Sequence, residues 1–471
     1  MTGLQAKKKT ETEGVLRAIN PATGVVVREQ AVDTGAAVEK RLAAAAEAGR
    51  EWRETSFATR AKLLNAVADV MQENKPRYAA MMTEEMGKPA HEADGEVEKS
   101  IWCSRHYAEH AESYLAREVI ESDATLSYVQ YMPLGTVLGI LPWNAPFWLA
   151  FRFAAPALMA GNTCLMKHDP HVPGCAAMIA EAFEKADVPA GIFQPLYLET
   201  PAVEAVIRDA RVRAVSFTGS SHGGAAVARI AASEIKPAVL ELGGSDPCIV
   251  LKDADLDAAA DVIVLSRIIN AGQSCIAAKR VIAEAPVYDK LAALLKEKLS
   301  ALKVGDPAAA DTKVGPLARA DLRDNLHRQV KETIKQGATC LLGGDLPDGA
   351  GFFYPVTLLG DVKPGMCAFT EETFGPVAVL IRADDENHAM AMANDTPYGL
   401  GASIWSADVK KAEDMARNIE AGQVAINGIV KTDPRLPSGG MKRSGYGREL
   451  GPHGIRAFTN AQQVWVGPGR G

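Results

Sequence analysis

One cysteine lies in a loop of small and polar residues, NAGQSCIAAKR at 270–280, which follows the apolar stretch VIVLSRII. Such a cysteine is a buried space-filler, half of a disulfide, a metal ligand or a nucleophile. The chain has seven scattered cysteines, with no C-x-x-C and no Cys/His cluster at zinc spacing. We therefore expect neither a disulfide framework nor a metal site. Because most cysteines of a reducing compartment are small buried hydrophobes, a nucleophilic role for Cys275 depends on the residues around it.

Two further polar residues stand at the ends of apolar, strand-like segments. Asn144 lies between two prolines in PWNAPFW, directly after TVLGIL. Prolines stiffen a turn, so a side-chain amide held there can point an N–H at a developing oxyanion; the alternative is an Asn144 that bonds local backbone. Glu241 ends the apolar part of LELGGSDP. Its carboxylate is either paired structurally or has its pKa raised toward neutrality, as a general base requires.

Two motifs are typical of contacts with a nucleotide. FTGSS at 217–221 takes a strand into a helix through Gly219 and Ser220, and a helix N-terminus offers free N–H groups to a phosphate. The full G-x-G-x-x-G fingerprint is absent, so a helix cap without a ligand is an equal alternative. EETFGPV at 371–377 is either a solvated acidic loop or a site where Glu372 accepts ribose hydroxyls and Phe374 lies against a flat ring.

The segments that must position these residues alternate between strand and helix. TVLGIL, TCLMK, IFQPLYL, VRAVSFT and AVLEL have strand composition, and helical segments separate them. Such alternation implies parallel crossovers and therefore an α/β fold with a doubly wound, Rossmann-like sheet, a common nucleotide-binding architecture. A second α/β section begins near residue 243, and residues 33–115 have the apolar periodicity of amphipathic helices.

Two strand-like segments, ATLSYVQYMP and AFTNAQQVWV, lie outside this alternation. We predict a cofactor-binding domain (1–115 and 133–242), a catalytic domain (243–445) and an oligomerisation arm (116–132 and 456–471). Edge strands are unsatisfied on a monomer, so the arm predicts a homodimer or a homotetramer.

Composition limits the class of partner. The chain has 471 residues, 47% of them apolar, and a net charge of -7, which gives no electrostatic reason for binding nucleic acid or an anionic membrane. The basic N-terminal segment has no apolar core, and no apolar run reaches the length of a membrane helix. We therefore expect a cytoplasmic protein that acts on a small molecule.

In order and spacing, these motifs resemble those of the aldehyde dehydrogenase superfamily over essentially the whole chain. The segments that carry the resemblance are PWNAPFW, FTGS, LELGG, GQSC, EETFGPV and GGMKRSGYGRE. The resemblance implies an oxidoreductase in which Cys275 is the nucleophile, Glu241 the general base and Asn144 the oxyanion donor. The backbone N–H of Cys275 would be the second donor.

The same resemblance implies a nicotinamide cofactor and the residues that hold it. They are Trp143 lining the site, Lys167 at the adenine ribose, Gly219 and Ser220 at the pyrophosphate, Leu242 near the nicotinamide, and Glu372 with Phe374 at its ribose. Where many members read Lys-Pro-Ser-Glu, this chain reads Lys167-His168-Asp169-Pro170. Asp169 would partly replace the glutamate that excludes a 2'-phosphate and His168 would do the opposite, so NAD or NADP stays open, with a slight lean to NAD.

Arg152 lies in an otherwise apolar helical run, FWLAFRFAAPALMAG. A buried guanidinium needs a carboxylate, from a protein salt bridge or from a ligand. Its place resembles that of a substrate-binding arginine in succinate-semialdehyde dehydrogenases, and GNTCLMKH, ELGGSDPCIVLKDADL, AAKR and LRDNLHRQV resemble the Sad type of that class. By this resemblance Thr432 and Arg435 would also meet the substrate carboxylate, but Ile269 stands where better-known members have a second arginine.

These expectations combine into NAD(P)-dependent oxidation of an aldehyde, with succinate semialdehyde to succinate as the preferred reaction. Glutarate semialdehyde, longer ω-oxo acids and neutral aldehydes remain alternatives. So do a CoA-acylating dehydrogenase, a cofactor-free thiol esterase that uses Cys275 and Asn144, and a catalytically silent scaffold.

Overall fold

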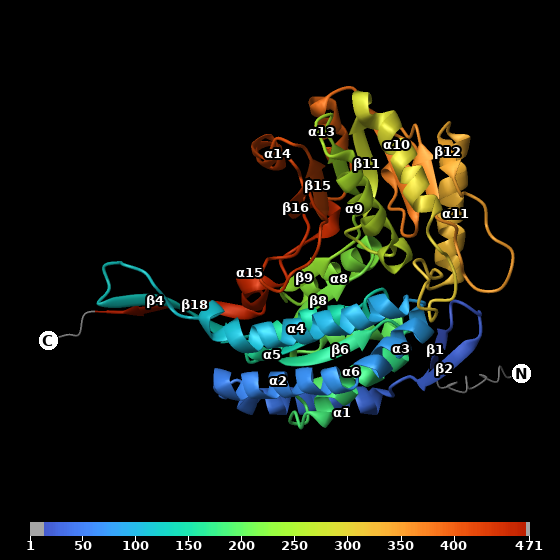
Figure 1. Cartoon of the computed structure of the whole chain (residues 1–471). Helices are drawn as coiled ribbons and strands as arrows, with labels where there is room; N and C mark the ends of the chain where they lie inside the picture. The colour runs from blue at the N-terminus through green and yellow to red at the C-terminus, as the bar shows by residue number, and fades with distance from the viewer. Residues whose placement is uncertain (1–13, 468–471) are drawn as a thin grey trace, which may run out of the picture.

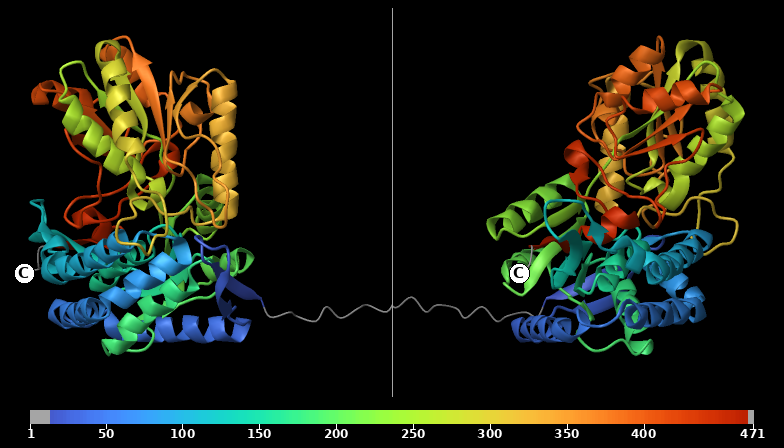
Figure 2. Two further views of the ribbon diagram at one scale, coloured as in Figure 1. Left: turned by 45° about the vertical axis from the view of Figure 1, so that its right-hand side comes forward. Right: turned by 90° about the vertical axis from the view of Figure 1, so that its left-hand side faces the viewer.

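The computed structural model describes residues 14–467. Figure 1 shows two bodies, one stacked on the other, with a flat β arm projecting from the junction on one side. The two bodies stay distinct in views turned by 45° and 90° (Figure 2). The N-terminal segment 1–13 and the last four residues of the predicted arm, 468–471, lie outside the described residues.

The lower body is built on a six-stranded sheet in the order β17-β9-β8-β5-β6-β7. Its strands are β5 (Thr136–Leu141), β6 (Thr163–His168), β7 (Phe193–Pro195), β8 (Val212–Thr218), β9 (Ala238–Glu241) and β17 (Gly445–Tyr446). All are parallel except β17, which pairs antiparallel with β9. Every residue of β5 and β6 is buried, which explains their nearly continuous apolar composition.

Helices cover both faces of this sheet, which confirms the doubly wound α/β fold predicted from the alternation of strands and helices. On one face, α5 (Pro146–Met159) and α6 (Pro173–Lys185) lie beneath α2 (Phe57–Glu73), α3 (Lys75–Met86) and α4 (Ala90–Tyr114). On the other face lie α1 (Gly35–Trp52), η1 (Thr200–Ala202), α7 (Val203–Arg208) and α8 (Ser221–Ser233).

The upper body is built on a seven-stranded sheet in the order β12-β13-β14-β11-β10-β15-β16, parallel except for β12. Its strands are β10 (Asp246–Val250), β11 (Ala278–Glu284), β12 (Thr339–Leu342), β13 (Thr357–Gly360), β14 (Val377–Ala383), β15 (Gly401–Trp405) and β16 (Gln423–Ile426). Its helices are α9 (Leu256–Ile268), η2 (Ile269–Gly272), α10 (Ala285–Ser300), α11 (Ala320–Lys335), α12 (Cys367–Thr370), α13 (Glu386–Asn394) and α14 (Val409–Ala416).

The projecting arm is a three-stranded antiparallel sheet, β18-β4-β3, in which both predicted arm segments take part. Its strands are β3 (Glu118–Val119), β4 (Leu126–Pro133) and β18 (Thr459–Val466). A separate hairpin, β1 (Val15–Ile19) with β2 (Val26–Ala31), lies near the N-terminus.

After β16 the chain returns from the upper body to the lower one, where it forms η3 (Lys442–Ser444), β17 and α15 (Gly451–Arg456). Figure 1 shows this segment descending from the upper body to α15, which packs against α4. The return places Gly445 opposite Glu241 in the β17–β9 pair. The last part of the chain therefore forms part of the wall around the predicted general base.

Candidate active site

The predicted site residues gather where the two sheets meet. Asn144, Lys167, Gly219 and Glu241 lie at or just after the carboxyl ends of β5, β6, β8 and β9, the edge at which doubly wound sheets bind their ligands. Cys275 lies on the facing side, in the loop that leads into β11. The fold therefore brings the motifs of both sequence halves to one edge.

The nucleophile loop has an unusual backbone that its sequence accommodates. Asn270 and Ala271 have φ of 54° and 52°, and Gly272 has φ of 74°. A Cβ on Gly272 would lie 2.3 Å from the carbonyl oxygen of Gly375, so only glycine fits. The fully buried Arg267 donates from Nη2 to the carbonyl of Gly272 at 2.6 Å, which ties the loop to the end of α9.

Lys279, which the sequence reasoning did not single out, holds the loop from the other side. Its Nζ donates to the carbonyl of Ser274 at 2.9 Å and to that of Cys275 at 2.7 Å. Its Nζ also lies 3.2 Å from Oε1 of Glu372. Lys279 therefore fixes the backbone of Cys275 and links it to the acidic loop that the sequence assigned to the cofactor.

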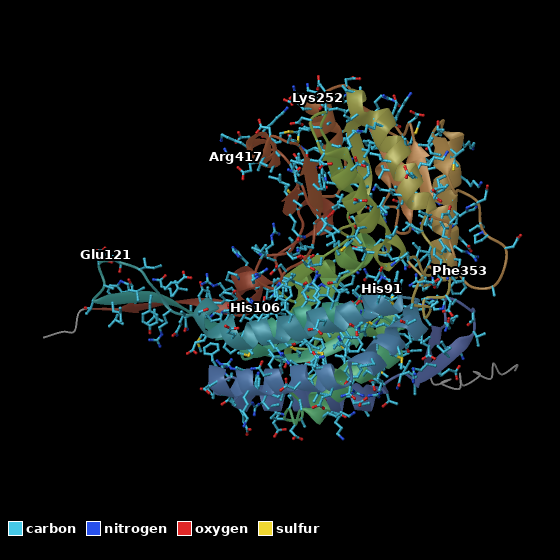
Figure 3. The ribbon with its side chains drawn as sticks, in the orientation of Figure 1. His91, His106, Glu121, Lys252, Phe353 and Arg417 are labelled. Atoms are coloured by element: carbon cyan, nitrogen blue, oxygen red, sulfur yellow. The ribbon has the colours of Figure 1, made fainter. Side chains whose placement is uncertain are left out.

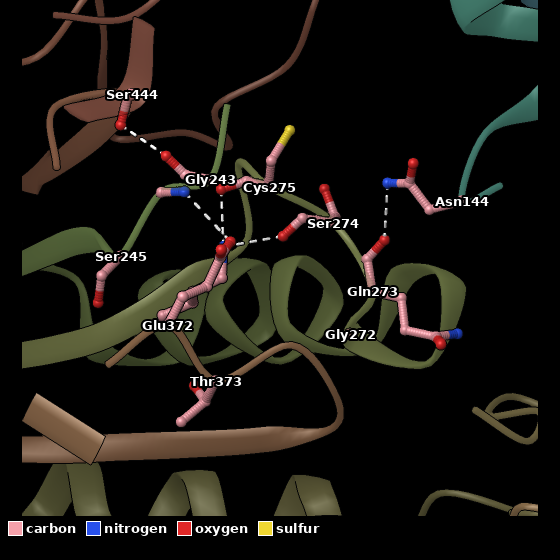
Figure 4. A network of polar contacts seen from close by, with 12 residues as sticks. Asn144, Gly243, Ser245, Gly272, Gln273, Ser274, Cys275, Glu372, Thr373 and Ser444 are labelled. Carbon is pink, nitrogen blue, oxygen red and sulfur yellow. Dashed lines mark hydrogen bonds and ion pairs between the residues drawn. The ribbon is translucent and has the colours of Figure 1, made fainter. Parts of the chain in front are cut away.

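The amide of Asn144 points at the nucleophile loop, as Figure 4 shows. Its Nδ2 donates to the carbonyl of Gln273 at 3.1 Å, and no second hydrogen bond from Nδ2 to a described residue is present. The backbone carbonyl of Asn144 accepts hydrogen bonds from Asn270 Nδ2 at 2.7 Å and from Lys88 Nζ at 3.0 Å. Its side chain bonds another loop rather than its own turn, which leaves one amide N–H for a ligand.

Two acids of α4 hold the backbone around Asn144 and the nucleophile loop in place, and the sequence did not indicate either of them. Glu96 pairs with Lys88 and accepts the backbone N–H groups of Phe147 and Trp148 at the start of α5. Glu92 accepts the backbone N–H of Asn270 at 2.6 Å, and burial raises its pKa to about 7. The signal available in the sequence was two acids four positions apart on a helix face otherwise occupied by Ala93, Val97 and Ser100.

Glu241 is a buried carboxylate without a full set of partners. It is 3% exposed, and its Oε1 has no hydrogen-bond partner among residues 14–467. Burial raises its pKa to about 7, against the opposing charge of Arg152, whose Nη2 lies 3.8 Å from Oε2 of Glu241. Of the two alternatives left by the sequence, the carboxylate has the environment of a general base and only a loose ion pair.

Cys275 is held as a thiol. Burial raises its pKa to about 11, the positive charges of Lys279 and Arg152 oppose this, and the negative charge of Glu241 adds to it. Among the described residues its backbone N–H has no acceptor. A proton acceptor is therefore needed before the sulfur can attack, and a free backbone donor lies at the attacking residue.

Arg152 is buried in α5, with 4% of its side chain exposed. Its Nε pairs with Oε2 of Glu449, and Ser216 donates from Oγ to Oε1 of Glu449 at 3.0 Å. Burial alone would lower the pKa of Arg152, but the charges of Glu449 and Glu241 raise it above its ordinary value. The protein salt bridge left open by the sequence is therefore present at Nε, while Nη1 and Nη2 donate no hydrogen bond to a described residue.

The structure separates the other two predicted substrate contacts. Thr432 is buried, and its Oγ1 accepts a hydrogen bond of 2.7 Å from Nζ of Lys99 in α4. Arg435 forms a two-point pair with Asp433, with distances of 2.9 Å and 2.6 Å, and its side chain is 65% exposed above Trp102. Thr432 therefore belongs to the buried cluster near Arg152, and Arg435 does not.

The residues predicted to hold a nicotinamide cofactor come from the carboxyl ends of the lower sheet's strands and from the acidic loop before β14. Ser220 is the N-cap of α8 and accepts the N–H of Gly223 at 3.2 Å, and Gly219 packs on the ring of Phe217. Lys167 is buried, burial lowers its pKa, and it forms no ion pair within the described part of the chain.

The residues predicted to lie near the nicotinamide are those of the acidic loop, together with Leu242 and Trp143. The rings of Trp143 and Phe374 meet edge to face at 5.9 Å between centroids. Oε1 of Glu372 accepts the N–H of Gly244 at 3.1 Å, and Leu242 packs on Gly224 of α8. The unpaired Lys167, the glycine turn into α8 and the acceptor Glu372 are the groups that a dinucleotide requires, so these residues fit such a cofactor.

The structure makes His168 neutral and keeps Asp169 ionised. His168 is buried, its Nε2 lies 3.1 Å from the carbonyl of Pro146, and burial lowers its pKa to about 4, so it is neutral. Burial opposes ionisation of Asp169, but a 2.7 Å contact with His171 outweighs it and lowers the pKa of Asp169. His168 thus supplies no positive charge, and the carboxylate of Asp169 is hydrogen-bonded to His171.

The described residues contain no group of three or more His, Cys, Asp or Glu side chains placed to hold a metal ion. Within the same residues, no helix combines the length and apolarity needed to cross a membrane.

The sequence profile of the aldehyde dehydrogenase family matches residues 7–464, so the chain belongs to that family and is an oxidoreductase of that kind. Among its relatives, a probable succinate-semialdehyde dehydrogenase [NADP(+)] of Synechocystis is 48% identical over 95% of this chain and 99% of its own length. Succinate-semialdehyde dehydrogenase [NADP(+)] 1 of Mycobacterium tuberculosis is 47% identical, with the same two coverages.

The crystal structure of succinic semialdehyde dehydrogenase from Streptococcus pyogenes, in complex with NADP+, has the same fold. It superposes with a TM-score of 0.94 at 33% identity and covers 96% of this chain and 100% of that one. The lean toward NAD drawn from the sequence has no support from these three proteins, all of which are named with NADP.

Proposed function

We propose that this enzyme oxidises succinate semialdehyde to succinate with NADP as the hydride acceptor. The observation that supports the chemistry is that three groups lie at one site. They are the half-buried thiol of Cys275, the amide of Asn144 that points at its loop, and the carboxylate of Glu241, one oxygen of which has no hydrogen bond. Together they fit covalent aldehyde oxidation through a cysteine.

Attack begins with loss of the thiol proton from Cys275. Glu241, with a pKa of about 7, accepts that proton at neutral pH, and the sulfur forms a bond to the aldehyde carbon. The electron pair of the C=O double bond moves to oxygen. That oxyanion accepts hydrogen bonds from the free amide N–H of Asn144 and from the backbone N–H of Cys275.

The residues then hold the tetrahedral carbon while it loses hydride. A nicotinamide cofactor, when bound by Lys167, the start of α8, Glu372 and Phe374, supplies the acceptor for that hydride. Lys279 keeps the backbone of Cys275 in place through two carbonyls. An electron pair on the oxyanion forms the C=O double bond again as the C–H bond breaks. A thioester on Cys275 remains.

Hydrolysis of the thioester again needs Glu241. Once it has released its proton to solvent, the carboxylate takes a proton from water, and the resulting hydroxide adds to the thioester carbon. The C–S bond breaks, the sulfur leaves as thiolate, and the carboxylic acid product ionises. Glu241 therefore serves both halves of the reaction.

A substrate that carries its own carboxylate is supported by Arg152. Its Nε is engaged by Glu449, whereas its Nη2 makes only a loose ion pair of 3.8 Å with Glu241. A guanidinium held at one edge presents its other N–H groups in a fixed direction, which suits a carboxylate. The exposed Arg435, already paired with Asp433, is not part of this proposal.

NADP is supported by its appearance in the names of the relatives and by the pairing of Asp169. A free carboxylate at this place would repel a 2'-phosphate, but Oδ1 of Asp169 is already engaged in a 2.7 Å hydrogen bond with Nδ1 of His171.

An initial-rate panel tests the proposal: succinate semialdehyde, glutarate semialdehyde and hexanal, each with NAD and NADP. We expect the highest kcat/KM for succinate semialdehyde with NADP. A higher value for hexanal would overturn the carboxylate-bearing substrate, and a higher value with NAD would overturn the cofactor preference. Acyl-CoA formation when CoA is added would identify a CoA-acylating enzyme, and ester hydrolysis without cofactor would identify an esterase.

A further inference from the structure

Lys99 lies on α4 where that helix meets the returning C-terminal segment. Figure 3 labels His91 and His106 along α4, and Lys99 lies between them in the sequence. Its Nζ donates to Oγ1 of Thr432 at 2.7 Å and lies 4.1 Å from the centroid of the Trp148 ring. The ammonium group is thus held by a hydroxyl from one side and an aromatic face from the other.

No carboxylate pairs with Lys99 within residues 14–467. The acids whose charges reach it are already engaged: Glu96 with Lys88, and Asp433 with Arg435. A largely buried ammonium without a counter-ion is costly, because neither water nor an opposite charge replaces its full hydration. The site therefore lacks one negative charge.

A second cation lies close to Lys99. The charge of Arg152 disfavours the protonated form of Lys99, and Arg152 in turn acts on Cys275 and Glu241. The charge of Arg152 thus acts both on Lys99 and on the reacting groups. Two cations that repel each other, with free N–H donors on both, form a site that one small anion would stabilise.

Thr432 adds a hydroxyl donor to the N–H donors of Lys99 and Arg152. Its oxygen accepts from Lys99, and its own hydroxyl proton is donated to no other described residue. A hydroxyl that accepts a hydrogen bond from an ammonium is polarised and becomes a better donor. Lys99, Thr432 and Arg152 therefore bring N–H and O–H groups from α4, the C-terminal segment and α5.

We propose that Lys99, together with Thr432, binds the distal carboxylate of an ω-oxo acid substrate as the second cationic group beside Arg152. The inference rests on the proposed function and names a specificity residue that the sequence did not indicate. An acid whose carboxylate lies between Lys99 and Arg152 has its carbonyl end directed to Cys275. A neutral aldehyde of the same length leaves Lys99 without a carboxylate partner.

Burial, and next the charge of Arg152, lower the pKa of Lys99 to about 8; Cys103, Glu96 and Asp433 oppose this. A bound carboxylate would raise that pKa again. For wild-type enzyme we therefore expect the KM for succinate semialdehyde to rise as the pH exceeds about 8, with no matching rise for butanal.

The test compares succinate semialdehyde with butanal, which has the same four-carbon chain without the carboxylate. Lys99→Met should raise the KM for succinate semialdehyde by about 10- to 100-fold, the loss expected for a hydrogen bond between charged groups, with little change in kcat. The kcat/KM for butanal should change by less than about threefold, which also shows that the variant is folded. Lys99→Arg should keep most of the affinity and lose the rise in KM above pH 8.

Lys431→Met is the matched control, because it removes the same charge one residue from Thr432 on an exposed side chain. It should leave both substrates unchanged. If Lys431→Met weakens succinate semialdehyde as much as Lys99→Met does, the effect is long-range charge and the inference is wrong.

The two proposals fail in different ways. A wild-type enzyme that does not prefer succinate semialdehyde over butanal overturns the proposed function and, with it, the role of Lys99. A wild-type preference that survives in Lys99→Met overturns the role of Lys99 alone and leaves Arg152 as the anchor. Should Lys99→Met fail to fold, Thr432→Val gives the same contrast, with a rise in KM confined to the acidic aldehyde.

Discussion

At the scale of single residues, the site depends on buried charges that lack full partners. Glu241 has one oxygen without a hydrogen bond, and Lys99 has no carboxylate. Arg152 connects them, since it lies beside Glu241 and its charge also acts on Lys99. Removing one of these groups should change the ionisation of the others, which makes pH profiles informative.

Cys275→Ala should lower aldehyde oxidation by about a thousand-fold or more, because no other described cysteine lies in the loop that Asn144 reaches. Binding of NADPH, followed by its fluorescence, should be retained because the cofactor surface is unchanged. Substantial oxidation by the variant would contradict nucleophilic catalysis by Cys275.

The pH dependence of kcat should follow Glu241. Only the ionised carboxylate accepts a proton, so activity should fall as the pH drops through about 7. In Arg152→Met the carboxylate loses a nearby positive charge, so its pKa should rise further and the acid limb of the profile should move to higher pH. The measurement is kcat for hexanal, whose binding does not need Arg152, between pH 5 and 9. An unmoved profile would show that Arg152 does not tune the base.

At the scale of elements, the sequence predicted more than single residues could. The alternation of apolar strands and helices was enough for the doubly wound sheet, because parallel strands buried on both faces read as apolar runs. It also predicted that four site residues lie at one edge of the sheet, because the carboxyl ends of parallel strands share an edge. These residues are Asn144, Lys167, Gly219 and Glu241.

The sequence did not predict the contacts between elements that are distant in the chain. Nothing in the sequence around Arg152 indicates Glu449 as its partner, and nothing around Thr432 indicates Lys99. These pairs arise because the C-terminal segment returns across α4 and α5, and return paths of this kind leave no local periodicity. Arg435 is a different case, since its guanidinium pairs with Asp433, a local partner only two residues away.

The nucleophile loop offers a prediction at the same scale. Gly272→Ala should lower both the unfolding temperature and the activity, because a Cβ would lie 2.3 Å from the carbonyl oxygen of Gly375 in addition to the cost of φ at 74°. Gly24→Ala is the matched control, since Gly24 has the same φ and no atom within 4 Å of an added Cβ. It should cost only about 1–2 kcal/mol of stability and leave kcat unchanged. Equal effects in both variants would mean that the loop tolerates the added methyl group.

At the scale of the whole molecule, the arm is the feature that a single copy does not explain. β18, β4 and β3 form a narrow sheet that projects from the body (Figure 1), and it exposes large apolar side chains. These are Val119, Ile120, Leu126, Trp465 and Val466. Exposed apolar edges of this kind favour association between copies.

We therefore predict that the protein is a homodimer or a homotetramer through the arm. Light scattering after size exclusion should give a multiple of the 50.0 kDa chain mass. The double variant Val119→Lys, Ile120→Lys should shift the mass toward one chain, because two charges on an exposed edge oppose pairing. Replacing the exposed Val409 with Lys, on α14 far from the arm, is the control. A wild-type protein of one chain mass would refute the prediction.

The β17–β9 pair has a consequence for how the enzyme is made. Glu241 pairs with Thr218 of β8 on one side, but it has its neighbour on the other side only when residues 445–446 are in place. The Nε group of Arg152 has its buried counter-ion only when Glu449 is present. Both lie close to the C-terminus, whereas Cys275 and Asn144 emerge from the ribosome much earlier. The catalytic centre is therefore among the last parts of the molecule to be completed during synthesis. A prematurely terminated chain would carry the nucleophile without the walls that set the pKa of its base.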